Sequence, residues 1–280
     1  GASWFIGFQD PGERYEPDRL TAVFEQTGVP ARTFFLTHPT FTASLQERFQ
    51  YHNLNLVTYQ DVMGPQTGRP QILVKQFSAA LHALLVDTLQ TGLTNPARHG
   101  QGWRYLELLG VSHVAAMADI KDPRLTALHR FQIQGSPQPL TIYRLNSPQP
   151  RLSMQYRYRV ADKPEEAAAL LGATNQPPLV LDQAGLREAG NPVLPPPLSG
   201  TNIPAHSLAV RHFGHNRIEL EVYTAEPGLL CLLDQYHKDW RVSINGKAGV
   251  IVPVNVFARG IPLGKGTSRV SLHFAPPVWP

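Results

Sequence analysis

The sequence predicts an α+β protein, with a mixed α/β unit over residues 1–185 and an antiparallel β-sandwich over residues 206–280. Three observations predict this fold class. Strand-like and helix-like patterns alternate in the first part, only strand-like patterns follow residue 206, and the stretch 186–205 between them is rich in proline. Because proline lacks an amide donor and fixes φ, we expect that stretch to be an extended linker.

The first elements of the α/β unit are predicted from hydrophobic periodicity. Strand-forming runs cover 32–37 and 54–59, and apolar residues at helical spacing predict a helix over 74–89. A second helix is expected over 103–109, where a glycine ends it, and a strand over 111–116 follows at once.

The rest of the unit repeats this alternation. The runs 131–134 and 140–145 flank a Gly-Ser-Pro turn, which predicts a hairpin. Strict alternation of apolar and polar residues over 152–160 predicts one half-buried strand. A capping box begins a helix over 162–172, and a strand over 179–181 ends the unit.

Every pattern after the linker is typical of strands. Alternation predicts strands over 216–223, 240–244, 250–252 and 270–274. Trp240 is expected in their core, and Asn245-Gly246 is the two-residue turn that hairpins favour. Five or six short strands in about seventy residues indicate a small sandwich.

Composition limits the function. The chain has 280 residues, 42% hydrophobic and 16% charged, which suits one large domain or two ordinary ones. Its 25 basic residues are dispersed rather than clustered, so the sequence does not favour a nucleic-acid partner. The single Cys231 excludes an internal disulfide, and its apolar neighbours predict a buried side chain rather than a reactive thiol. No apolar run reaches the about 18 residues that a membrane-spanning helix needs.

No sequence motif nominates a self-contained active site. Residues 264–268 look superficially like a phosphate loop, but they lie between predicted strands, so we expect a turn. His206, His212 and His215 are close in the sequence without a further ligand, which favours loop histidines over a metal site. Alternation of tyrosine and arginine over 156–159 favours an amphipathic strand over a stacking platform. We therefore predict no metal and no cofactor.

Four segments carry a resemblance to a known family. They are Leu108-Leu109-Gly110-Val111, then Pro150-Arg151 with Lys163–Ala167 and Leu179–Asp182, then Gly228–Gly246 with Asp234-Gln235-Tyr236, and lastly Asn255–Pro276 with Arg259-Gly260. In these segments the chain resembles the C-terminal extracytoplasmic region of YfhO-like polytopic bacterial membrane proteins. That family belongs with the GT-C type of lipid-sugar-dependent glycosyltransferases. The resemblance covers residues 100–280.

The resemblance implies a soluble extracytoplasmic accessory domain, periplasmic or at the cell surface, that is tethered to the membrane in the full-length protein. The fragment itself is expected not to be catalytic, since the catalytic acid of such enzymes lies between their first membrane helices. Its expected partners are the parent protein's own transmembrane region and a glycan or lipid-linked sugar, with the domain positioning an acceptor or partner. Two alternatives stay open: a stand-alone carbohydrate-binding or protein-interaction module, and a free-standing hydrolase.

The predicted ligand-binding residues are Tyr236, Asn255 and Arg259. They fall at or near strand-to-loop transitions, where binding residues concentrate. An aromatic face beside a guanidinium suits a sugar, and the guanidinium can also hold a lipid-linked phosphate. The competing interpretation is structural: Asn255 shapes a turn, and Arg259 pairs with Asp234 or Asp239 to hold adjacent strands.

Overall fold

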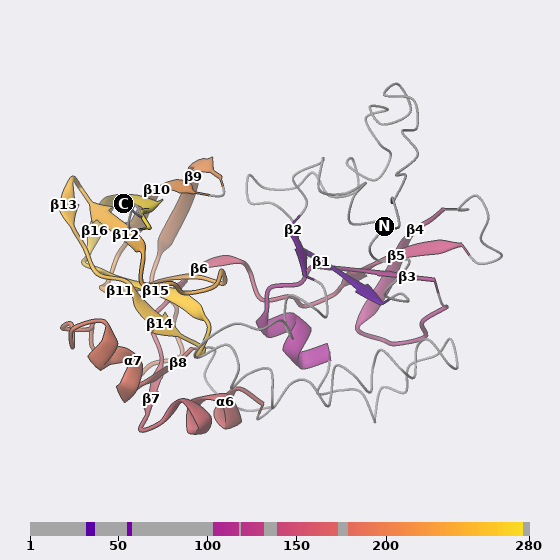
Figure 1. Ribbon diagram of the computed structural model, residues 1–280, viewed down its shortest axis with the longest axis horizontal. Helices are drawn as coiled ribbons and strands as arrows, with labels where there is room; N and C mark the ends of the chain where they lie inside the picture. The colour runs from indigo at the N-terminus through magenta and orange to yellow at the C-terminus, as the bar shows by residue number, and fades with distance from the viewer. Residues whose placement is uncertain are drawn as a thin grey trace, which may run out of the picture.

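The computed structural model describes residues 32–36, 55–57, 103–117, 119–131, 139–172, 179–214 and 216–276. Within these ranges strands dominate and pair mostly antiparallel, as Figure 1 shows. The β-rich character of the predicted fold is therefore confirmed. The helix predicted over 74–89 lies outside the described residues.

One sheet, here called the N-terminal sheet, has the strand order β2-β1-β3-β5-β4. Its strands are β1 (Arg32–Leu36), β2 (Asn55–Val57), β3 (His113–Ala116), β4 (Leu125–Phe131) and β5 (Leu140–Leu145). β1 pairs parallel with β2 and β3, whereas β5 pairs antiparallel with β3 and β4. The strand that pairs with β5 is β4, which runs from Leu125 to Phe131, whereas the rest of the predicted strand over 131–134 and its turn lie outside the described residues. A register shift between Ala127 and His129 interrupts the alternation by which the sequence pattern would reveal that strand.

A short helix over residues 103–108 leads into β3. Gly110 follows it at φ +68°, and Val111 N donates to Leu106 O at 3.0 Å, a hydrogen bond typical of a helix end. Glycine suits this left-handed position because it has no Cβ. A Cβ there would also lie 3.1 Å from Leu233 Cδ1, so the packing of the helix end needs glycine as well. The predicted end of this helix is confirmed.

Two further sheets contain the C-terminal strands. The outer sheet, of order β13-β12-β16-β10-β9, contains β9 (His206–Phe213), β10 (Arg217–Thr224), β12 (Trp240–Ile244), β13 (Lys247–Ala248) and β16 (Gly266–Phe274). The central sheet, of order β14-β15-β11-β6, contains β6 (Leu152–Gln155), β11 (Gly228–Leu232), β14 (Val252–Val254) and β15 (Ala258–Leu263). Apolar side chains of both sheets form one core cluster, in which Leu230 and Ile261 of the central sheet join Leu220 and Leu272 of the outer sheet.

The central strand β11 is buried on both faces, which explains its continuous apolar sequence. Leu230 and Leu232 belong to the cluster shared with the outer sheet, whereas Leu229, Cys231 and Leu233 belong to a second cluster that extends to the N-terminal sheet. Successive side chains of a strand point to opposite faces, so one strand can serve two cores. Cys231 is buried, as predicted, and burial raises the pKa of its thiol to about 12.

The boundary predicted at residue 185 does not separate the sheets. β6 precedes that residue, yet it pairs antiparallel with β11, and Met154 lies opposite Leu230. A strand from the first predicted unit thus belongs to the same sheet as strands of the second.

The strand predicted over 152–160 is in fact two strands, β6 and β7 (Arg159–Ala161). The residues between them bind the proline-rich stretch instead of continuing the ladder. Leu198 N donates to Tyr156 O at 2.8 Å, and Tyr158 OH donates to Pro195 O at 2.6 Å. The stretch predicted as a linker is therefore packed against these tyrosines.

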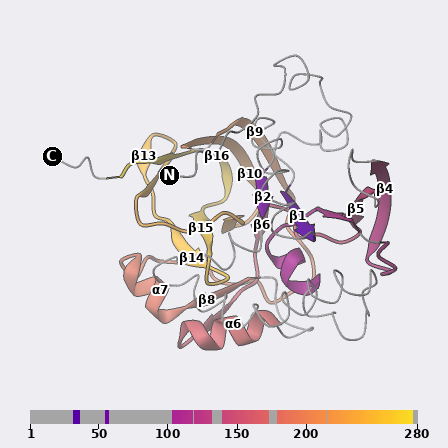
Figure 2. The same ribbon diagram turned by 45° about the vertical axis from the view of Figure 1, so that its right-hand side comes forward.

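Two helices cover the remaining strand pair. α6 (Pro164–Gly172) packs against β7 and β8 (Val180–Asp182), and α7 (Gln183–Glu188) packs against β8 and β14, as Figure 2 shows. α6 begins at Pro164, and the acid that accepts from Asp162 N is Glu166, at 2.9 Å, rather than Glu165 of the predicted capping box. α7 ends inside the predicted linker, whose first three residues are thus helical.

The Asn245-Gly246 turn is present, since these residues have φ +53° and +79°. Its returning strand is β13, however, and the prediction of a strand over 250–252 is wrong. Val252 begins β14, which belongs to the central sheet. Trp240 is half-buried and packs against the core cluster from its margin.

Candidate functional site

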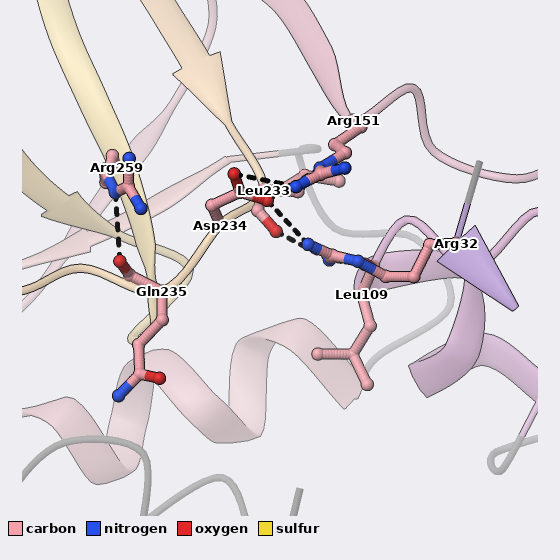
Figure 3. Close-up of polar contacts among 7 residues, drawn as sticks. All are labelled: Arg32, Leu109, Arg151, Leu233, Asp234, Gln235 and Arg259. Carbon is pink, nitrogen blue, oxygen red and sulfur yellow. Dashed lines mark hydrogen bonds and ion pairs between the residues drawn. The ribbon is translucent and has the colours of Figure 1, made fainter. Parts of the chain in front are cut away.

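Three arginines gather around one carboxylate where β11 ends. This arginine cluster consists of Arg32, Arg151, Asp234 and Arg259, and Figure 3 shows Asp234 between Arg259 on one side and the other two arginines on the other. Arg32 begins β1, Arg151 directly precedes β6, Asp234 lies just beyond β11 and Arg259 lies on β15. The cluster therefore connects the N-terminal sheet to the central sheet.

Asp234 accepts hydrogen bonds from two of the arginines. Arg151 holds it with two donors, Nε to Oδ1 at 2.7 Å and Nη2 to Oδ2 at 3.0 Å. Arg32 Nη2 donates to Oδ1 at 2.6 Å. The side chains of Arg32 and Asp234 are 11% and 13% exposed. Such paired, sheltered, charge-assisted hydrogen bonds are among the stronger ones in proteins.

Arg32 also binds backbone oxygens from two different elements. Its Nη1 donates to Leu109 O, beyond the helix over 103–108, and to Leu233 O at 2.7 Å, at the end of β11. Carbonyls at a helix C-terminus lack partners inside the helix, and a cation there is favourable. One side chain thus joins the helix end to the end of the central strand.

Arg259 has different surroundings. Its Nε donates to Gln235 O at 3.0 Å, and its guanidinium carbon lies 3.9 Å from the centroid of the Trp240 ring, a cation–π geometry. The residue is only 5% exposed. Its Nη1 is buried and has no hydrogen-bond partner among the described residues.

Burial and charge oppose one another in this cluster. Burial alone would raise the pKa of Asp234, but the charges of Arg32 and Arg151 outweigh it and lower that pKa below its usual value. Burial lowers the pKa of Arg32 and of Arg259 to about 10 each, against the opposing attraction of Asp234. Arg32, Arg259 and Asp234 are therefore charged at neutral pH, and the cluster contains three guanidinium groups against one carboxylate.

The structure brings two of the three predicted binding residues to this region. Tyr236, which is half-buried, donates from its backbone N to Phe257 O at 2.6 Å and so lies beside the segment that leads to Arg259. Asp239, the other acid considered as a partner of Arg259, lies 3.5 Å from His237. Arg259 instead bonds to the carbonyl of Gln235.

Asn255 has the contacts of a turn-shaping residue. It is 2% exposed, has φ +49°, and forms two hydrogen bonds with one residue of β8. Its backbone N donates to Val180 O at 2.7 Å, and its Oδ1 accepts from Val180 N at 2.9 Å. Ligand binding by Tyr236, Asn255 and Arg259 stays a prediction.

The sequence analysis did not name Arg32 or Arg151 as a binding residue, and it considered Asp234 as part of a family-like segment and as a partner of Arg259. All three lie at strand ends, which is the signal that nominated the other candidates. Nothing in the sequence spacing pairs Arg32 with Asp234, however, since they are 202 positions apart.

No group of three or more metal-ligating side chains occurs within the ranges that the structure describes. In the same ranges, no helix combines the length and the apolar character that crossing a membrane requires. Comparison of the chain with protein-family models, with curated proteins and with solved structures finds no match.

Proposed function

We propose that this chain is an extracytoplasmic accessory domain of a membrane glycosyltransferase-like protein of the YfhO-like type, where it positions a glycan acceptor or a partner and is not itself catalytic. The observation that carries the proposal is that the residues in and around the arginine cluster come from the segments that resemble this family. Each of the four segments that resemble the family contributes to the cluster or to its direct contacts. Leu109 supplies the carbonyl that binds Arg32, and the other three segments supply the side chains of Arg151, Asp234 and Arg259.

Convergence of these segments supports the resemblance in physical terms. The segments are far apart in the sequence, and short motifs that matched by chance would have no reason to gather in one region of the fold. Arg32, which lies outside them, completes the contact by donating to both Leu109 O and Asp234. The motif residues therefore belong to one assembly that unites the N-terminal and central sheets.

The β-sandwich is part of the proposal. The outer and central sheets share one apolar cluster, as two sheets packed face to face do. The loop from Asp234 to Trp240 connects the two sheets, because β11 belongs to the central sheet and β12 belongs to the outer sheet.

The neighbourhood of Arg259 supports a role in holding an anionic glycan. The guanidinium of Arg259 stacks on the ring of Trp240. Half-buried Tyr236 lies in the loop that leads to Trp240. Aromatic rings pack against sugar faces, whereas guanidinium groups bind phosphate. A lipid-linked sugar presents both chemical groups.

The first test is the reading frame that encodes the chain. The proposal expects further apolar segments of about 20 residues, each long enough to span a bilayer. The second test is sugar transfer by the full-length protein with Tyr236→Ala and, as a matched control, Tyr223→Ala, whose side chain belongs to an exposed residue of the outer sheet. We expect loss of transfer in the first variant only, with unchanged melting temperatures.

Two results would contradict the proposal. Equal sugar transfer by the Tyr236 and Tyr223 variants would show that the loop containing Tyr236 takes no part in transfer. Release of product from a glycan by the chain on its own would instead identify a hydrolase.

A further inference from the structure

We infer that the arginine cluster binds a phosphoryl group, which accepts a hydrogen bond from Nη1 of Arg259 and is attracted by the charges of Arg151 and Arg32. The inference goes beyond the proposed function, because the site requires neither a glycan acceptor nor a membrane enzyme. Its test uses neither, so the two proposals can fail separately.

The first argument is charge. Asp234 is the only carboxylate among the four side chains of the cluster, and its two oxygens already accept three hydrogen bonds from Arg32 and Arg151. Arg259 is close enough to Asp234 for its positive charge to lower the pKa of that carboxylate. The positive charges of Arg151 and Arg32 in turn lower the pKa of Arg259. The four side chains carry three positive charges and one negative charge, so this sheltered site favours an anion such as a phosphoryl group.

The second argument is an unused donor. Buried nitrogen atoms of arginine almost always have a hydrogen-bond partner. Arg259 Nε donates to Gln235 O, but Arg259 Nη1 is buried and has no partner among the described residues. The residue is 5% exposed, so bulk water does not satisfy this donor.

The third argument is the direction from which a ligand can approach. Trp240 covers one face of the guanidinium, with its ring centroid 3.9 Å from the guanidinium carbon. Oxygen acceptors bind guanidinium groups in the plane of the fork, where two parallel N–H groups meet two oxygens. Gln235 is exposed and Trp240 half-buried, so the group would reach this edge from the loop between β11 and β12, with a shift of the indole ring.

The experiment is thermal unfolding of the full chain in increasing inorganic phosphate, against sodium chloride of matched ionic strength. The variants are Arg259→Met, which removes the charge and the donors, and Arg259→Lys, which keeps the charge. Arg269→Met is the control, since Arg269 is an exposed arginine of the outer sheet. We expect saturable stabilisation by phosphate in the wild type and the control, about tenfold weaker binding in Arg259→Lys, and none in Arg259→Met.

Tryptophan fluorescence gives a second measurement on the folded wild type. Because the ring of Trp240 stacks on Arg259, binding should change its emission, and Trp240→Phe should abolish that change. If Arg259→Met does not fold, the weakening in Arg259→Lys together with this signal supports the site. Equal stabilisation in sodium chloride, equal phosphate binding by Arg259→Lys and the wild type, or phosphate stabilisation that persists in Arg259→Met would overturn it.

Two further probes identify the source of the phosphoryl group. Glucose 1-phosphate represents a sugar phosphate, and phosphatidylcholine vesicles that contain phosphatidic acid represent a lipid headgroup. Arg259-dependent binding of either probe supports the site and names its source. Failure of inorganic phosphate and of both probes to bind would overturn the inference.

Discussion

Asp234 accepts three hydrogen bonds from two arginines and lies in the electric field of a third, all in a sheltered position. A buried ion pair contributes little net stability over an apolar substitute, but removal of one partner is costly. The carboxylate is therefore the residue whose loss leaves the most uncompensated charge behind.

The substitution Asp234→Asn tests this directly. It preserves the size of the side chain but leaves three guanidinium groups without their counter-charge, and we expect a loss of about 3–5 kcal/mol in the free energy of unfolding. Urea denaturation measures this loss. The matched control is Glu221→Gln, which removes an exposed ion pair with Arg211 and should cost less than about 1 kcal/mol. Equal costs for the two variants would contradict the assignment.

The same carboxylate predicts how stability depends on pH. Because the pKa of Asp234 is lower in the folded protein than its usual value, the folded state favours the ionised form. This contribution is complete above the unfolded pKa, about 3.9, and is lost as the pH falls through the folded value. Urea midpoints measured from neutral to acidic pH should therefore fall more steeply in the wild type than in Asp234→Asn. Parallel curves would exclude the contribution.

Among the elements, β14 packs so closely on β15 that position 260 of β15 has no room for a side chain. Val252 of β14 lies opposite Gly260 of β15. A Cβ at Gly260 would lie 2.5 Å from Val254 Cγ1 and 3.1 Å from Val252 Cγ2, both within the buried core. Arg259 directly precedes Gly260 on β15, so a shift of this strand would also move the arginine.

We expect Gly260→Ala to destabilise the fold by about 1–3 kcal/mol, the usual cost of overpacking. The matched control is Gly264→Ala, because no atom lies within 4 Å of a Cβ at that position. Chemical denaturation of the two variants under one condition compares them. Unchanged stability of Gly260→Ala would mean that β14 moves away at little cost.

At the scale of the whole molecule, the central sheet binds the two predicted units together. β6 comes before the proline-rich stretch, yet it supplies Met154 to the cluster shared with the outer sheet. β11 contributes to that cluster from one face and to the N-terminal cluster from the other. The parts of the chain therefore share cores instead of meeting at a surface.

This sharing predicts which fragment folds. A fragment over 206–276 lacks β6, so it exposes one edge of β11 and loses Leu152 and Met154 from its core. A fragment over 150–276 retains both. We expect a cooperative thermal transition and dispersed amide NMR signals from the longer fragment only. A cooperative transition in the shorter fragment would show that residues 206–276 fold independently, as the sequence predicts.

The outer sheet could be predicted because its strands have one face in the core and one in solvent. Ile218, Leu220 and Val222 alternate with polar residues and are all buried. β11 has no such alternation, so its sequence predicts burial but not its neighbours. Its partner β6 shows the alternation of a strand, but not which strand it joins.

The candidate site could be predicted only in part, for a similar reason. Arg259 and Tyr236 were identified by their position at strand ends, but the meeting of Arg32 and Asp234 depends on the three-dimensional fold. The role of Asn255 was also ambiguous, because the same residue type binds ligands and stabilises left-handed turns. Its two hydrogen bonds to Val180 become visible only when β8 is in place.

The separation of Arg32 from Asp234 has a consequence for protein synthesis. The two residues are 202 positions apart, and ribosomes add roughly 5–20 residues per second, so about 10–40 s pass between their translation. During that interval the start of β1 has been made, but the carboxylate and the strand that it adjoins have not. The contact that Arg32 makes between the N-terminal and central sheets therefore cannot form until Asp234 has been synthesised and has left the ribosome.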